Sequence, residues 1–93
     1  MNNDRLASNL RAANEAHVAA LRTGDQRAIR TAYIAALEAE RDLLVDCGGE
    51  VDMAAASDLE YQIEDERAAL TRMPALALMA LLPVAWTLAH LAR

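Results

Sequence analysis

The chain has 93 residues, a net charge of −5 and a single cysteine. A chain of this length forms one domain at most and buries a modest core, and one cysteine excludes an intramolecular disulfide. Nine arginines scattered among fourteen acidic residues offer no strong basic face, which argues against direct nucleic-acid binding. Alanine (22 residues) and leucine (14 residues) dominate while Phe is absent, so we predict an all-α fold.

The first predicted helix occupies residues 2–23. Polar residues at positions 2–4 can cap its N-terminus. Apolar side chains then recur at intervals of three or four residues, which is the spacing of one buried helical stripe. This stripe contains Leu6, Leu10, Ala13, His17 and Leu21.

A second helix is predicted from residue 26 to residue 47. Gly24 is suited to end the first helix, and Asp25 is suited to cap the second. So short a loop makes the two helices an antiparallel hairpin, in which residues whose numbers sum to about 48 lie side by side. This register places Arg11 near Glu38 and Arg5 near Asp42. The predicted buried stripe contains Ile29, Tyr33, Ala36, Leu37, Leu44 and, at its end, Cys47.

A third helix is predicted to begin at Ser57 and to run to about residue 72. Two glycines at positions 48 and 49 end the second helix, and residues 50–56 are ambiguous, with a short helical turn as one possibility. Ser57 and Glu60 have the spacing of a capping box, which marks a helix start. The third stripe is thin and is interrupted by Glu66 or Arg67; it contains Leu59, Ile63, Leu70 and Met73.

Acidic residues concentrate between residues 38 and 66, where eleven carboxylates accompany Arg41 alone. The ordinary interpretation is a solvated helix face that maintains solubility. The alternative is a surface that binds a basic region of another protein or mimics the charge of a nucleic acid, with an aromatic side chain as its anchor. The candidate partner-binding residues are Asp58, Glu60, Tyr61, Glu64 and Asp65.

The segment 73–92 contains no Asp, Glu, Lys or Arg. Pro74 predicts a bend at residues 72–74 and a fourth helix that follows it, and Pro83 predicts a kink in the middle of that helix. We therefore divide the chain into an acidic helical domain (1–72) and an apolar C-terminal helix (73–93). The large apolar side chains expected to be buried, in protein or in lipid, are Leu76, Leu78, Met79, Leu81, Leu82, Trp86 and Leu88.

A helix that is apolar on every side is either deeply buried or a membrane span. Nineteen helical residues extend roughly 28 Å, close to the hydrocarbon thickness of a bilayer, and Arg72 and Arg93 bracket the segment. One interpretation is therefore an inner-membrane protein anchored by its C-terminus. We favour a cytoplasmic protein in which this helix, divided at Pro83, completes a four-helix bundle. A monomer of this size cannot cover every face of such a helix, so this interpretation implies a homodimer or a bound protein.

Residues for catalysis or cofactor binding are scarce. His17, His90 and Cys47 do not supply the four clustered ligands of a structural zinc site, and His17 is interpreted as a half-buried residue of its stripe. Cys47 lies at the negative end of a helix dipole, which disfavours a reactive thiolate. Gly48 and Gly49 follow a helix without a lysine, unlike a phosphate-binding loop. We expect neither metal nor cofactor, and no enzymatic activity.

The sequence thus predicts a small helical module that binds another protein stoichiometrically, as an adaptor or an inhibitor. Its size and acidity resemble, by composition alone, inhibitors that mobile elements encode, which suggests a bacterial or phage source. The alternative is a tail-anchored membrane protein whose cytoplasmic helical head recruits partners. A third interpretation is a regulator within a nucleoprotein complex that does not touch DNA itself.

Overall fold

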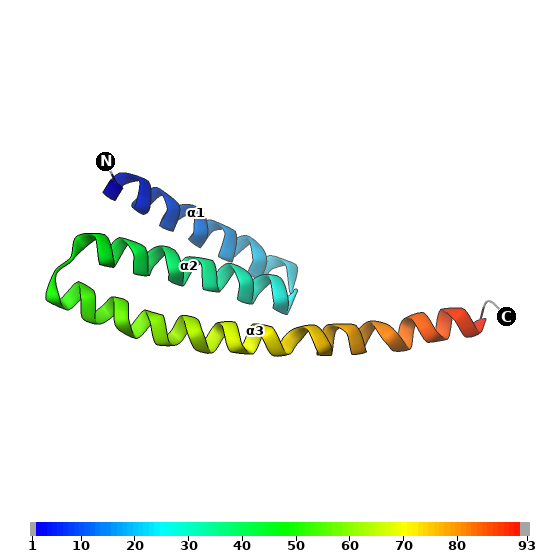
Figure 1. Cartoon of the computed structure of the whole chain (residues 1–93). Coiled ribbons are helices and arrows are strands. Elements are labelled where there is room, and N and C mark those ends of the chain that lie inside the picture. The colour runs from blue at the N-terminus through cyan, green and yellow to red at the C-terminus, as the bar shows by residue number, and fades with distance from the viewer. Residues whose placement is uncertain (1, 92–93) are drawn as a thin grey trace.

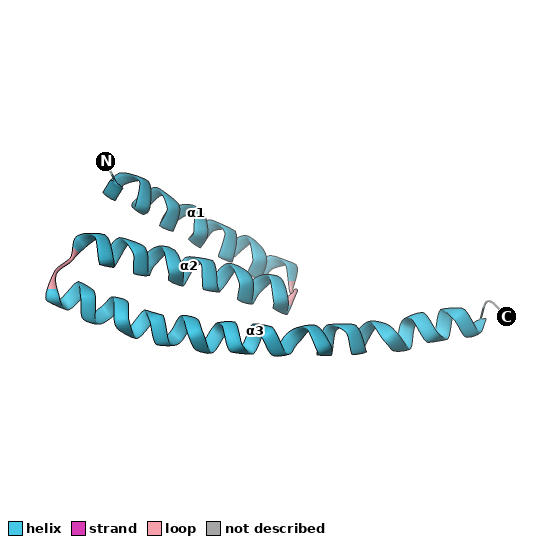
Figure 2. Cartoon of the chain, viewed as in Figure 1, coloured by secondary structure: helices cyan, strands magenta, loops and turns pink. Residues whose placement is uncertain are grey.

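The computed structural model describes the backbone of residues 2–91 and the side chains of residues 3–73. This part of the chain is helical and contains no strand (Figure 2). Its three helices are α1 (Asn2–Thr23), α2 (Gln26–Cys47) and α3 (Glu50–Leu91). The all-α prediction is confirmed. The molecule is elongated, with extents of 65 × 23 × 17 Å (Figure 1).

Both connections between the helices are tight turns at glycines. Gly24 and Gly48 have φ values of 72° and 74°, in the left-handed region that glycine adopts without steric cost. Asp25 caps α2, because its side chain accepts a hydrogen bond of 3.0 Å from the backbone N–H of Arg27. The backbone N–H of Gly48 donates to the carbonyl of Leu44 at 3.2 Å and closes the last turn of α2. The predicted ends of the first two helices are therefore confirmed.

The third helix differs from its prediction at both ends. It begins at Glu50, so the predicted start at Ser57 is wrong: the ambiguous residues 50–56 form its first turns. The alanines at positions 54–56 favour helix strongly enough for α3 to start before the capping box. At the other end a single helix continues through Pro74 to Leu91, so neither a separate fourth helix nor a kink at Pro83 is confirmed.

The division of the chain at residues 72 and 73 stays a prediction, since α3 continues across it. The large apolar side chains expected to be buried in the C-terminal segment, from Leu76 to Leu88, lie outside the described side chains. No helix among the described residues combines the length and the apolar character that crossing a membrane requires.

The helices form a single layer with α2 in the middle. α1 packs on one side of α2 and α3 on the other, and within the described residues α1 and α3 do not pack against each other (Figure 1). The buried cluster lies between α2 and α3, where Ile34 and Leu37 meet Ile63. Tyr33, Leu59 and Leu70 pack around this cluster, which confirms the stripe predicted for the third helix.

The stripe of α1 follows the prediction until its last residue. Leu6, Leu10, Ala13 and His17 are half-buried, and the next half-buried position is Ala20, whereas Leu21 is exposed. Spacings of four, three, four and three keep a residue on one face of the helix, and position 20 continues this pattern. The prediction for Leu21 was therefore wrong by one position.

In α2 the predicted stripe is incomplete. Its residues Ala36 and Leu37 are buried, and Ile29, Tyr33 and Leu44 are half-buried, whereas Cys47 is exposed. The most important omission is Ile34, which is buried against α3. A single buried stripe is enough for a helix that packs against one neighbour. Because α2 packs against α1 on one side and α3 on the other, it buries residues on two faces.

Replacing the central core residue should be costly. Ile63 is fully buried, so we expect Ile63→Ala to lower the free energy of unfolding by about 2–5 kcal/mol, through lost transfer free energy and a residual cavity. Val51, on the same helix, is 82% exposed, and Val51→Ala should change this value by less than about 0.5 kcal/mol. Urea denaturation followed by circular dichroism measures both. Equal effects would contradict the assigned core.

Candidate partner-binding surface

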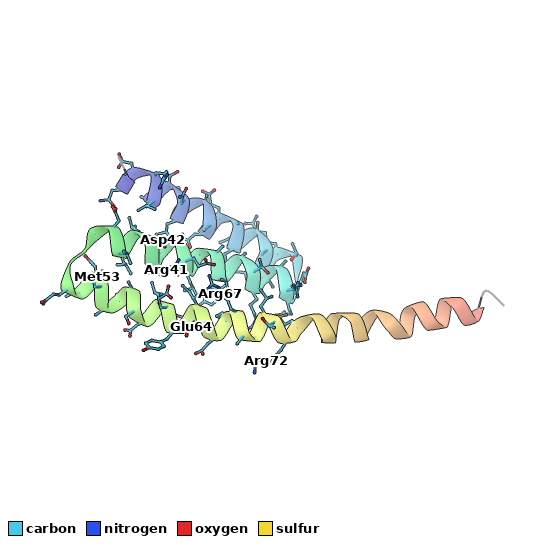
Figure 3. All side chains as sticks on the ribbon, viewed as in Figure 1. Arg41, Asp42, Met53, Glu64, Arg67 and Arg72 are labelled. Atoms are coloured by element: carbon cyan, nitrogen blue, oxygen red, sulfur yellow. The ribbon has the colours of Figure 1, made fainter. Side chains whose placement is uncertain are left out.

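Three arginine–glutamate contacts join α2 to α3. They lie on both sides of the buried cluster, and Figure 3 shows Arg41 and Arg67 between the two helices. The pairs are Arg30 with Glu66 at 3.0 Å, Arg67 with Glu38 at 2.9 Å, and Arg41 with Glu60. We call these three pairs the α2–α3 ion-pair seam. Because these three pairs join opposite charges of α2 and α3, the seam favours a single antiparallel register of the two helices.

Arg41 lies between two carboxylates. It donates hydrogen bonds to Glu60 on α3 and, at 3.0 Å, to Asp42 beside it on α2. The hydrogen bond to Glu60 raises the pKa of the Arg41 guanidinium above its usual value, partial burial opposes this, and Asp42 adds to the increase. This contact holds Glu60 on the side of α3 that faces α2.

The seam divides the predicted acidic surface. Glu60 belongs to the seam, whereas Asp58, Glu64 and Asp65 are exposed and take part in none of the ion pairs found among residues 3–73. The structure therefore does not place Glu60 with the other four candidate residues.

Tyr61 is the most exposed aromatic side chain of the described residues, at 69%. Asp58, Tyr61 and Asp65 are spaced by three and four residues, so they share the face of α3 opposite to Ile63. Arg72 lies on the same face two turns further on and points away from α2 (Figure 3). We call Asp58, Tyr61, Glu64 and Asp65 the outer acidic face.

The predicted hairpin register is correct, but the ion pairs derived from it are not. Leu6, Asn9 and Ala13 of α1 line a shallow groove together with Ala35, Ala39 and Asp42 of α2, so position numbers do sum to 48. Glu38, expected beside Arg11, instead binds Arg67 of α3, and Asp42, expected beside Arg5, binds Arg41. Glu38 and Asp42 pair with Arg67 and Arg41 because the turns of α2 that carry these acids also pack against α3.

A second hollow, of about 280 Å³, is lined by side chains from all three helices. Its lining consists of His17, Gln26, Ile29, Arg30, Tyr33 and Glu66. The rings of His17 and Tyr33 are 5.2 Å apart, and the Tyr33 hydroxyl accepts a hydrogen bond of 2.6 Å from Gln62. Arg30 and Glu66 neutralise each other here, so the hollow presents no isolated charge.

No group of three or more His, Cys, Asp or Glu side chains within residues 3–73 is arranged to hold a metal ion. The described part of the chain is thus a small layer of three helices with an acidic face on α3. Comparison with known protein families, curated proteins and solved structures found no match to this chain.

The ion-pair seam should contribute modestly and unequally to stability. We expect a double-mutant cycle of Arg41→Met and Glu60→Gln to give a coupling energy near the upper end of about 0.2–1 kcal/mol. The matched cycle, Arg67→Met with Glu38→Gln, should give less, because the side chain of Arg67 is 54% exposed and that of Arg41 only 22%. Urea denaturation of the unmodified chain, the four single variants and the two double variants provides both values. A larger coupling for Arg67 would contradict this order.

Proposed function

We propose that this protein is a non-enzymatic interaction module that binds a partner protein stoichiometrically, as an adaptor or an inhibitor, and that it works as a homodimer. The observation that carries the proposal is the exposure of Tyr61 between Asp58 and Asp65 on the outer acidic face. An aromatic ring surrounded by carboxylates combines a large apolar contact with charge complementarity to a basic surface.

The ion-pair seam supports this assignment, because within residues 3–73 its acids are paired and those of the outer acidic face are not. Two acids of α3 that flank its contact with α2 are matched by arginines, Glu60 by Arg41 and Glu66 by Arg30. A carboxylate already held by an arginine offers little to a partner, because its desolvation would also break an existing contact. The outer acidic face offers a basic partner carboxylates without such contacts among the described residues, next to an exposed aromatic ring, and its charge would steer that partner during encounter.

A second proposal, a tail-anchored membrane protein, is supported by the charge-free segment 73–92 with Arg72 and Arg93 at its ends. In that protein the same outer acidic face would recruit partners to the membrane surface. Extraction of expressing cells with alkaline carbonate separates the two proposals. An anchored protein stays in the membrane pellet, and a homodimeric module is recovered in the supernatant.

We expect partner capture to depend on the outer acidic face. A variant with Tyr61→Ala, Asp58→Ser and Asp65→Ser should bind the captured partner at least about ten-fold more weakly, since a central tyrosine commonly contributes 1–2 kcal/mol or more to an interface. Affinity capture from an extract of the native host identifies the partner, and titration with the purified partner measures the loss.

The matched control carries Glu40→Ser and Asp46→Ser, two exposed acids of α2. It loses the same amount of charge as the first variant and should bind the partner as the unmodified protein does. Circular dichroism should show the same helicity for both variants. Equal binding by the two variants would reduce the outer acidic face to a feature that maintains solubility.

A further inference from the structure

The layer of three helices has two broad sides, and a different hollow opens on each of them. The hollow lined by His17, Ile29 and Tyr33 opens on one side, which we call the Tyr33 side. The groove that contains Glu38 and Asp42 opens on the other. On α2, five positions separate Tyr33 from Glu38, which corresponds to about 140° around the helix axis. The two sides are therefore distinct surfaces.

Apolar side chains of α1 border the Tyr33 side. Leu10 lies seven residues before His17, and Leu21 lies four residues after it. Both are therefore close to His17 in helical phase and flank the same face of α1. Val18 is 49% exposed and Leu21 is 53% exposed, and a groove of about 600 Å³ runs along α1 past Leu10 and Val18. Arg11 and Arg22 line this groove as well. The Tyr33 side thus offers a long, partly apolar trough.

α3 extends past this layer. α2 has 22 residues and α3 has 42, so the C-terminal half of α3 runs on beyond the ends of α1 and α2 (Figure 1). Residues 74–91 of this extension contain no charged residue. Because α3 is one continuous helix, its extension runs on past the layer and does not fold back over the Tyr33 side of its own chain (Figure 1).

We propose that the Tyr33 side of each chain is covered by residues 74–91 of α3 from a second copy, in a reciprocal two-fold dimer. This inference rests on the homodimer of the proposed function and specifies its interface. The second copy fits in length, since eighteen helical residues extend roughly 27 Å and the 22 residues of α1 extend roughly 33 Å. It also fits in chemistry, since a charge-free helix can cover the apolar side chains Leu10, Val18 and Leu21 that border this partly apolar trough. In a two-fold dimer, each contact of the first copy with the second is repeated by the same contact of the second copy with the first.

The area of two reciprocal contacts approaches that of a stable dimer. A helix about 10 Å wide and 27 Å long covers roughly 270 Å² in projection. Two such contacts, counted on both partners, bury roughly 1,100 Å² as a flat projection, which is smaller than the accessible area of the side chains. Stable protein interfaces bury roughly 1,200–2,000 Å², so two reciprocal helices come close to the lower end of this range, whereas a single one does not.

Two variants with equally exposed valines test the interface. Val18, at 49% exposure, borders the trough, and Val45, at 48%, lies on α2 seven residues after Glu38 and three after Asp42, on the other side of the layer. Light scattering coupled to size exclusion, over a hundred-fold range of concentration, should show a dimer for the full chain. We expect Val18→Glu to weaken the dimer at least ten-fold and Val45→Glu to leave it unchanged.

A photo-crosslinking amino acid at position 18 then locates the occupant. Chains carrying it are mixed with isotopically labelled chains without it, so cross-links between copies are recognised by mass. The proposal requires cross-links from position 18 to residues 74–91 of the labelled copy. Circular dichroism of both glutamate variants shows that they are folded.

Each other outcome overturns the inference. A dimer that cross-links through other residues, or that responds equally to both valine variants, would refute this interface and leave the homodimer standing. A monomer at every concentration would refute the interface and the homodimer together, and its binding to phosphatidylglycerol vesicles would favour the tail anchor. Capture of a partner through the outer acidic face is measured separately, so its failure is distinguishable from all of these.

Discussion

The contact of Ile63 with Ile34 and Leu37 is the constraint on which the described structure depends. Helices rich in alanine have few large side chains to bury, and Ile63 is the one large side chain that is fully buried among residues 3–73. Because it sits on α3 against two residues of α2, it sets both the rotation of α3 about its axis and its register along α2.

Once Ile63 faces α2, the other surfaces of α3 follow from helical geometry. Residues three positions away on either side, Glu60 and Glu66, lie at the flanks of the contact, where arginines of α2 reach them. Residues about half a turn away, Tyr61 and Asp65, face outward. One apolar contact therefore decides which carboxylates are neutralised within the chain and which are exposed to a partner. The arginines of α2 need no exact spacing for this, because their long side chains reach either flank.

The sequence predicts the features that depend on one helix or on one short loop. The stripe of α1, the cap at Asp25, the turns at Gly24 and Gly48, and the hairpin register all arise from local spacing. Ile34 could not be identified in this way, since its burial requires the knowledge that α2 has two neighbours. The role of Glu60 was missed for a related reason: Ser57 and Glu60 match a capping box locally, but Arg41 on another helix determines where the glutamate binds. The early start of α3 reflects the helix propensity of alanine, which a search for capping residues does not weigh.

The two proposed surfaces adjoin each other on α3. A helix of a second copy along the Tyr33 side would contact α3 near Gln62, whose side chain binds Tyr33. Asp58 and Asp65 lie four and three positions from Gln62 and border this contact, whereas Tyr61 and Glu64 lie about 100° and 160° away around the helix. Tyr61 and Glu64 would therefore stay open in the dimer and would be present twice. Two copies related by a two-fold axis can engage a partner that is itself symmetric, and the second contact then forms at a high effective concentration. Such pairing would strengthen the binding of a partner to a weak acidic surface, and it would give the charge-free half of α3 a function in the same molecule as its acidic half.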